Sequence, residues 1–286
     1  MKHKISILLF AFIASTFIVN AQDEDKSNIQ TYTPSKLLNQ GQWDIKWFNN
    51  LYTETKFANS SGAKTSKARE NYFTSSIEAF TGISENNRVN IGAIIEYRSN
   101  TKGGRQALSV FSFKDDPATE RKGITSIAPA IKFQPFKNIG NFSIQTAIHI
   151  PLVKNETENG VFLDQTAWAF QNRLFYDYSF NSQWQLFAEL NTEYNFGSKA
   201  SFANNTVVFT PGVFLSYFPS SKSTILGLVQ HSQRFGNFTQ DYTALGFGGK
   251  YQLTSTLNLE TIYTNFVRGT DNGLGQTFNI GLRLLF

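Results

Sequence analysis

The chain has 286 residues, a formal net charge of +5, 28 phenylalanines, 11 tyrosines and no cysteine. So mild a charge, without a compact basic run, argues against a nucleic-acid partner. With no cysteine and only three histidines, the sequence predicts neither a metal site nor a disulfide scaffold, and it contains no cofactor motif.

Residues 1–21 have the pattern of a secretory signal peptide. Lys2 and Lys4 precede an apolar run over residues 5–18, and Ala21 is a small residue of the kind that precedes a cleavage site. The run is too short to span a membrane as a stable helix. We therefore expect export from the cytoplasm with cleavage after Ala21.

Residues 22–41 begin acidic and polar, and we expect a periplasmic segment there. Thr33 followed by Pro34 suits the first positions of a helix, which predicts a short helix over residues 35–39 that Gly41 ends. The segment could cap or enter the domain that follows, although its composition favours a linker.

From Trp43 onward the sequence alternates between apolar and polar residues. In "RVNIGAIIEYR", residues 88–98, Val89, Ile91 and Ile95 fall on one face, while the charged residues fall on the other. A period of two is typical of a β-strand with two different faces. After the signal no apolar run approaches the roughly 20 residues of a spanning helix.

The connections between these strands alternate in length. Short turns are expected at residues 85–87, 137–141, 181–183, 220–223 and 254–256, and longer loops at 58–68, 99–122, 155–165, 198–205, 236–241 and 269–275. Short periplasmic turns and long outer loops are typical of bacterial outer-membrane barrels. The sequence thus predicts an all-β fold over residues 42–286: a single transmembrane antiparallel up-and-down β-barrel of about 12 strands, in a Gram-negative outer membrane.

Charged residues fall on the polar faces, which point into the lumen if the apolar faces meet lipid. A lysine or arginine facing lipid at mid-depth would cost about 2 to 4 kcal/mol. The predicted lumen-lining residues are the acids Asp44, Glu54, Glu78, Glu96, Asp177, Glu189, Glu193 and Glu260, the bases Lys46, Arg88, Arg98, Lys132, Arg173, Lys250, Arg268 and Arg283, and His149.

Such an interior allows two functions. Charged side chains can select solutes in a water-filled pore, which favours a passive channel for small polar or charged solutes. Alternatively the acids and bases pair across strands and fill the lumen, which would leave a closed barrel that acts through its outer loops. Loop 99–122, apolar in its middle, could constrict the pore, bind a partner or remain solvated.

Catalysis is the weakest hypothesis. His231 and Ser232 are adjacent on an expected strand and therefore point to opposite faces, so this pair cannot form a nucleophile and base. We predict no catalytic residue, and a lipid-modifying enzyme remains the least favoured alternative.

The segments "FIVNAQ", "GQWDIKWFNNLYTET" and "NIGLRLLF" resemble those of the outer-membrane β-barrel proteins of Bacteroidota, including transporters and porin-like proteins. The last strand resembles the signal that the barrel-assembly machinery recognises, with Phe286 at its terminal position. The resemblance implies an outer-membrane location, contact with outer-membrane lipid and assembly by that machinery. It implies no particular substrate.

Overall fold

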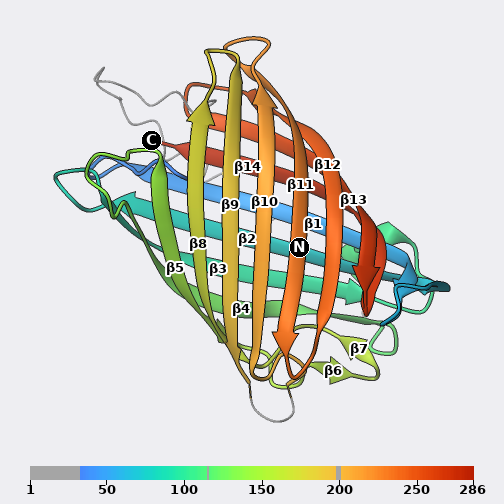
Figure 1. Ribbon diagram of the computed structural model, residues 1–286. Coiled ribbons are helices and arrows are strands. Elements are labelled where there is room, and N and C mark those ends of the chain that lie inside the picture. The colour runs from blue at the N-terminus through green and yellow to red at the C-terminus, as the bar shows by residue number, and fades with distance from the viewer. Residues whose placement is uncertain (1–32, 115, 198–200) are drawn as a thin grey trace, which may run out of the picture.

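The computed structural model describes residues 33–114, 116–197 and 201–286. Twelve long strands form one closed barrel, and two short strands form a separate hairpin (Figure 1). The strands are β1 (Trp43–Ala58), β2 (Lys64–Gly82), β3 (Val89–Thr101), β4 (Glu120–Phe133), β5 (Phe142–Pro151), β6 (Thr157–Glu158), β7 (Val161–Phe162), β8 (Trp168–Ser179), β9 (Trp184–Phe196), β10 (Thr206–Tyr217), β11 (Ser223–Gly236), β12 (Gln240–Gln252), β13 (Leu257–Thr270) and β14 (Asn272–Leu285).

Each barrel strand pairs antiparallel with its neighbours in the chain, and β1 closes the barrel against β14. The closure reaches the last residue: Trp43 N donates to Phe286 O at 2.7 Å, and Phe286 N donates to Trp43 O at 3.0 Å. A closed barrel leaves no unpaired strand edge, which is what lipid requires of a spanning sheet. The prediction of a twelve-stranded antiparallel barrel is confirmed.

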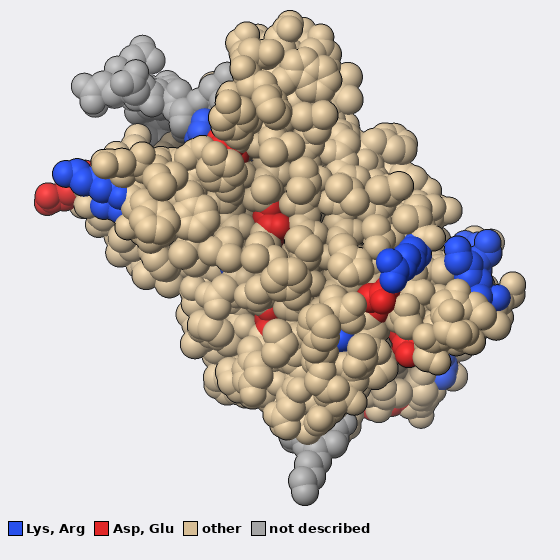
Figure 2. Space-filling view, viewed as in Figure 1, with Lys and Arg blue, Asp and Glu red and all other residues tan. Residues whose placement is uncertain are grey.

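The outer face of the barrel is apolar. On β3, Ile91 and Ile95 are 45% and 42% exposed, whereas Ile94, between them in the alternation, is 4% exposed and faces inward. On the face drawn in Figure 2, charged atoms gather mainly toward the ends of the barrel and are sparse across its middle. An apolar band between polar ends matches a barrel surrounded by lipid.

The two ends of the barrel differ. The short turns and the C-terminus lie at one end, here the turn end, and the β6–β7 hairpin lies at the other, the loop end (Figure 1). Several loops are shorter than expected because the strands continue into them, and two are shortened most in proportion to their expected length. β1 and β2 are joined by residues 59–63, and β13 and β14 by Asp271 alone, which has φ of +47°.

The predicted helix over residues 35–39 is absent. Residues 34–36 form a turn and the chain then runs extended, with Gln40 bridging Gly82 in parallel. The backbone donors bond to the barrel instead of to a helix, since Leu38 N reaches Asn90 Oδ1 at 3.2 Å. The predicted signal peptide, residues 1–21, lies outside the described residues.

Helical structure in the described residues is limited to one short 3-10 helix, η1 (Ala107–Phe111), between β3 and β4. No helix of the described residues has the length and apolar character that crossing a membrane requires.

The loop that carries η1 packs on the outer wall, so the alternatives of a pore constriction and of a purely solvated loop are wrong for it. Val110, 4% exposed, packs against Leu51 and Phe73, which alternate with the inward residues of β1 and β2. The apolar middle of the loop thereby buries itself on the apolar outside of the barrel. A different loop, residues 152–167, folds inward.

Candidate functional site

The lumen is the candidate site, and strand register brings its charges together. Lys46 on β1 stands opposite Glu78 on β2, and Lys250 on β12 stands opposite Glu260 on β13. Residues directly opposite on one face of an antiparallel pair are close enough to interact. The alternation that the sequence shows on single strands therefore becomes a lattice of acids and bases on the inner wall.

In the half of the lumen near the turn end, this lattice consists of short ion pairs. Arg283 binds both carboxylate oxygens of Asp44, at 2.9 and 3.1 Å. Lys250 Nζ lies 3.2 Å from Glu260 and Lys46 Nζ lies 3.9 Å from the same carboxylate. The Lys46 contact skips β14, where Gly281 leaves room between β1 and β13.

Arg173 joins opposite walls of the barrel. Its Nε donates to Glu189 on the neighbouring strand β9 at 2.8 Å, and its Nη1 lies 3.6 Å from Glu78 on β2. Between β8 and β2 the sheet contains β5, β4 and β3, so the second contact crosses the interior. Because a side chain from one wall reaches a carboxylate of another, the lumen is narrow at this level.

Residues 33–42, here the N-terminal insert, enter the lumen from the turn end. Leu38 is 0% exposed and packs against Phe80 and Leu285, both inward residues. Polar contacts hold the rest of the insert: Thr33 donates to Asp177 at 2.8 Å, and Lys132 Nζ donates to the backbone oxygen of Lys36 at 2.9 Å. The segment that the sequence predicted to be a linker therefore packs against the inner wall of the barrel and is hydrogen-bonded to it.

Residues 152–167, here the inward loop, occupy the lumen at the loop end. Asn100 Nδ2 donates to the backbone oxygens of Phe162 and Leu163, each at 2.9 Å. Asp164 lies 3.0 Å from Arg98, and burial raises the pKa of its carboxyl group above the ordinary value, against the pull of that guanidinium. Asn100 and Arg98 alternate with the outward residues of β3, so the loop lies inside the barrel.

Small cavities remain between these two obstructions. One of about 110 Å³ near the turn end is lined by Arg173, Glu189, Lys250 and the aromatic pair Phe187 and Phe214, among others. A second of about 90 Å³ lies beneath the inward loop. The two share no lining residue, and each is large enough for several water molecules.

The remaining predicted residues take several positions. Glu96, His149 and Glu193 line the cavity beneath the inward loop. Glu54 accepts hydrogen bonds from Lys67 at 2.7 Å and from Tyr52 at 2.6 Å.

Two predicted residues do not lie in the lumen. Arg88 is in the turn between β2 and β3, where its Nη2 donates to the backbone oxygen of Gln134 at 2.7 Å. Arg268 lies on the outer face and is 69% exposed. The reason is a bulge at Val267: Phe266 still pairs opposite Ala244, but Arg268 pairs opposite Thr243, on the other face.

Sequence reasoning missed Asn100, Arg121 and Asp164 because each takes part in a contact between a barrel strand and a loop far away in the chain. Arg121 Nη1 donates to the backbone oxygens of Asn155 and Glu156, at 3.1 and 2.8 Å. Arg121 and Asp164 were assigned to loops, where alternation carries no signal. His231 and Ser232, set aside as a catalytic pair, bond to Thr243 and Thr210 respectively.

Comparison with known proteins agrees with this geometry. The family model described as "Putative MetA-pathway of phenol degradation" matches residues 56–283. The chain belongs to this family. No curated protein matches the chain.

Among solved structures, this family member resembles an outer-membrane channel from Pseudomonas putida F1, with a TM-score of 0.69 and 10% identity over 89% of this chain and 99% of that one. It also resembles the β domain of the Bordetella autotransporter BrkA, with a TM-score of 0.57 and 13% identity over 85% of this chain and 99% of that one. At such low identity the likeness concerns the fold, which is that of outer-membrane barrels.

The contact between Asp164 and Arg98 predicts that the inward loop responds to pH. Since burial raises the pKa of Asp164, its proton binds at a higher pH than that of an ordinary carboxyl group, and the ion pair weakens as the pH falls toward that pKa. We expect conductance in planar bilayers to rise on acidification. Asp164→Asn should conduct at the higher level at every pH, whereas Asp116→Asn, which alters a loop carboxylate beside Arg105, should keep the pH dependence. Equal pH profiles for the Asp164 variant and the parent would contradict the assignment.

Proposed function

We propose that the chain is a passive outer-membrane channel for small polar or charged solutes. The observation that carries this proposal is a closed barrel whose inner wall presents both acids and bases to cavities that can hold several water molecules. Paired charges of both signs can bind a polar solute at successive points without trapping it. The family match and the likeness to an outer-membrane channel support the same function.

The turn end is then periplasmic and the loop end extracellular, as in bacterial barrels with short periplasmic turns. Both ends are narrowed, by the N-terminal insert and by the inward loop. Transport would therefore be limited to small solutes or would require one of these segments to move. The family description names phenol degradation, so phenol and benzoate belong with amino acids among the solutes to test.

Purified folded protein in planar bilayers tests the proposal. Discrete conductance steps are expected, together with faster swelling of protein-containing liposomes in permeant solutes. No current above that of protein-free bilayers, under conditions where the folded barrel is shown to be inserted, would refute the channel.

A closed barrel that acts through its outer loops is the second candidate. The two obstructions favour it, as does an aromatic cluster on the loop end, in which Phe202 contacts Phe162 and Phe238 at centroid distances of 5.2 and 6.1 Å. A sealed barrel that still binds a partner through this cluster is the result that would favour this candidate over the channel.

We further propose that residues 1–21 are removed as a signal peptide and that residues 22–41 remain as the periplasmic segment. The mass of the mature protein from outer membranes checks this. A mass that includes residues 1–21 would exclude cleavage.

Phe286 is proposed as the terminal signal for barrel assembly. Phe286→Ala keeps the backbone bonds that close the barrel against Trp43, so it separates the signal from the closure. We expect a severalfold drop in folded, heat-modifiable protein in cells. Phe180→Ala, which removes another exposed aromatic residue at the same end, serves as the control, and an equal drop in both variants would contradict a special role for Phe286.

A further inference from the structure

The barrel wall has an outward recess where β13 and β14 separate. Their ladder ends with Asn265 opposite Gln276. Beyond this point β13 continues along β12, and β14 continues along β1. Bulges at Val267 on β13 and at Thr55 on β1 accompany the separation. The space between the strands, here the outer recess, has a volume of about 590 Å³.

The recess carries three positive charges and no negative one. Lys56, Lys64 and Arg69 line it, and none of the described residues in its lining is acidic. Lys64 Nζ reaches only the backbone oxygen of Val267, at 3.5 Å. Within the described residues no hydrogen bond or ion pair engages the side chains of Lys56 and Arg69. Uncompensated cations that share a recess attract an anion.

The neighbouring base Lys67 differs from the three basic residues of the recess because it is paired with acids. It binds Glu54 at 2.7 Å and Glu70 at 2.8 Å, so its charge is neutralised. Arg69 alternates with Glu70 and shares the outer face with Asn71. The unpaired charges thus face away from the lumen, and a solute inside the barrel does not explain them.

The rest of the recess has both polar and apolar residues, and the polar ones include Thr53, Asn265 and Gln276. Leu274 and Phe278 belong to its wall. Phe266 lines only its inner side, because its ring stacks on the inward-facing Tyr242 at a centroid distance of 4.2 Å, with Tyr52 at 4.9 Å. A ligand that fills the recess therefore has an apolar part beside an anionic part.

The level of the recess along the barrel axis indicates which kind of ligand can reach it. Along β14 the outward residues are apolar from Leu284 to Phe278 and become polar at Gln276, whose neighbours across β1 and β13 are Thr53 and Asn265. This polar ring marks the outer edge of the apolar band, where lipid headgroups lie.

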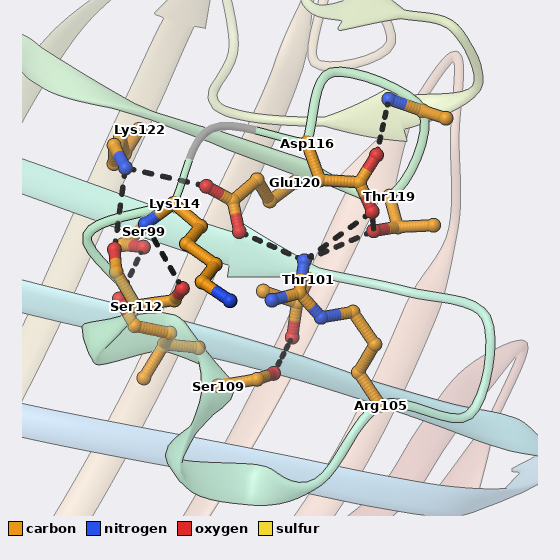
Figure 3. Close-up of polar contacts among 12 residues, drawn as sticks. Ser99, Thr101, Arg105, Ser109, Ser112, Lys114, Asp116, Thr119, Glu120 and Lys122 are labelled. Atoms are coloured by element: carbon orange, nitrogen blue, oxygen red, sulfur yellow. Dashed lines mark hydrogen bonds and ion pairs between the residues drawn. The ribbon is translucent and has the colours of Figure 1, made fainter.

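The η1 loop reaches the same level. Its Ala107 lines the recess, while Leu108 and Phe113 are 69% and 101% exposed. Figure 3 shows the polar contacts that hold the loop, in which Arg105 Nη1 donates to Glu120 at 2.8 Å and Lys122 Nζ to the same carboxylate at 3.2 Å. Here the charges neutralise one another, and the apolar side chains are left to meet lipid.

We propose that the outer recess binds a phosphorylated glycolipid of the outer leaflet. Lys56, Lys64 and Arg69 hold its phosphate groups, and one acyl chain lies along Phe278, on the apolar side of Gln276. Basic side chains at a membrane surface attract anionic lipid headgroups. The site is separate from the lumen, so it stands or falls independently of conductance.

Native mass spectrometry of the full mature barrel in detergent tests the proposal. Diphosphoryl lipid A and its dephosphorylated counterpart are the two probes. The parent should bind the phosphorylated probe preferentially, and Lys56→Gln combined with Lys64→Gln and Arg69→Gln should raise the Kd at least about tenfold. A matched triple variant, Lys137→Gln with Lys154→Gln and Lys222→Gln, makes the same change in net charge at exposed positions elsewhere and should bind as the parent does.

Three outcomes would overturn the proposal, once both variants show the heat-modifiable mobility of the folded barrel. They are unchanged binding in the recess variant, equal binding of the dephosphorylated lipid, and an equal loss in the matched variant. Displacement of the lipid by millimolar inorganic phosphate would also overturn it, since the site would then recognise free phosphate.

Discussion

A variant whose mature chain begins at Gln42 is expected to conduct about threefold better than the full chain, because the narrowest part of a pore limits its current. The missing segment fills the turn end of the lumen: Leu38 packs on Phe80 and Leu285, and Thr33 bonds to Asp177. Its removal leaves these inward side chains facing water. Single-channel recording in planar bilayers measures the change.

The inward loop lies in series with the insert and could mask this gain. A second variant therefore replaces residues 152–167 by a short Gly-Ser linker, and a third combines both changes. The combined variant should conduct best. If it conducts no better than the variant with the loop change alone, the insert is not an obstruction. The folded fraction on unheated gels is the control for each variant.

Arg173→Met is expected to lower the free energy of unfolding by about 3 to 5 kcal/mol, because it leaves Glu78 and Glu189 without their shared cation. The three side chains are only 13% to 24% exposed, so water replaces the lost contact poorly. Urea unfolding in detergent micelles measures the loss.

Two further variants serve as controls for the loss of stability expected of Arg173→Met. Arg173→Met combined with Glu78→Gln and Glu189→Gln should recover most of the stability, since no unpaired carboxylate remains. Arg268→Met removes an arginine that is 69% exposed and 3.9 Å from its acid, and should cost at most about 1 kcal/mol. Equal losses for Arg173→Met and Arg268→Met would contradict a structural role for the contact across the lumen.

Arg173→Met should also change the ion selectivity of the channel. Without Arg173 the narrow level of the lumen keeps two carboxylates, so cations should pass more readily relative to anions. Reversal potentials in a salt gradient measure this ratio. An unchanged reversal potential in a conducting variant would place the limiting level elsewhere in the barrel.

Much of the fold could be predicted from the sequence because strand alternation is local. The exposed pair Ile91 and Ile95 and the inward Glu96 follow from counting in twos along β3. The alternation of loop lengths predicted the strand number. The sequence was insufficient where a segment contacts a distant part of the chain. The helix expected at residues 35–39 is absent, and Leu38 N bonds to Asn90 instead. The position of loop 99–122, left open by the sequence, is outside the barrel.

Arg268 and Leu285 show most clearly where strand alternation fails to predict the face on which a side chain lies. Alternation places Arg268 in the lumen, but one bulge residue reverses every later face on that strand. Leu285 interrupts the apolar alternation of the last strand, and only the folded chain explains it, because it packs inward against Leu38.

The sequence alone determined the strands, their two faces and the charged interior, since each depends on a pattern within a few residues. The export signal is a prediction of the same local kind. Which charges meet, which loop enters the lumen and where the wall opens into a recess were decided by tertiary structure. Those features depend on register, bulges and barrel closure, and these bring together residues as distant in the chain as Asp44 and Arg283.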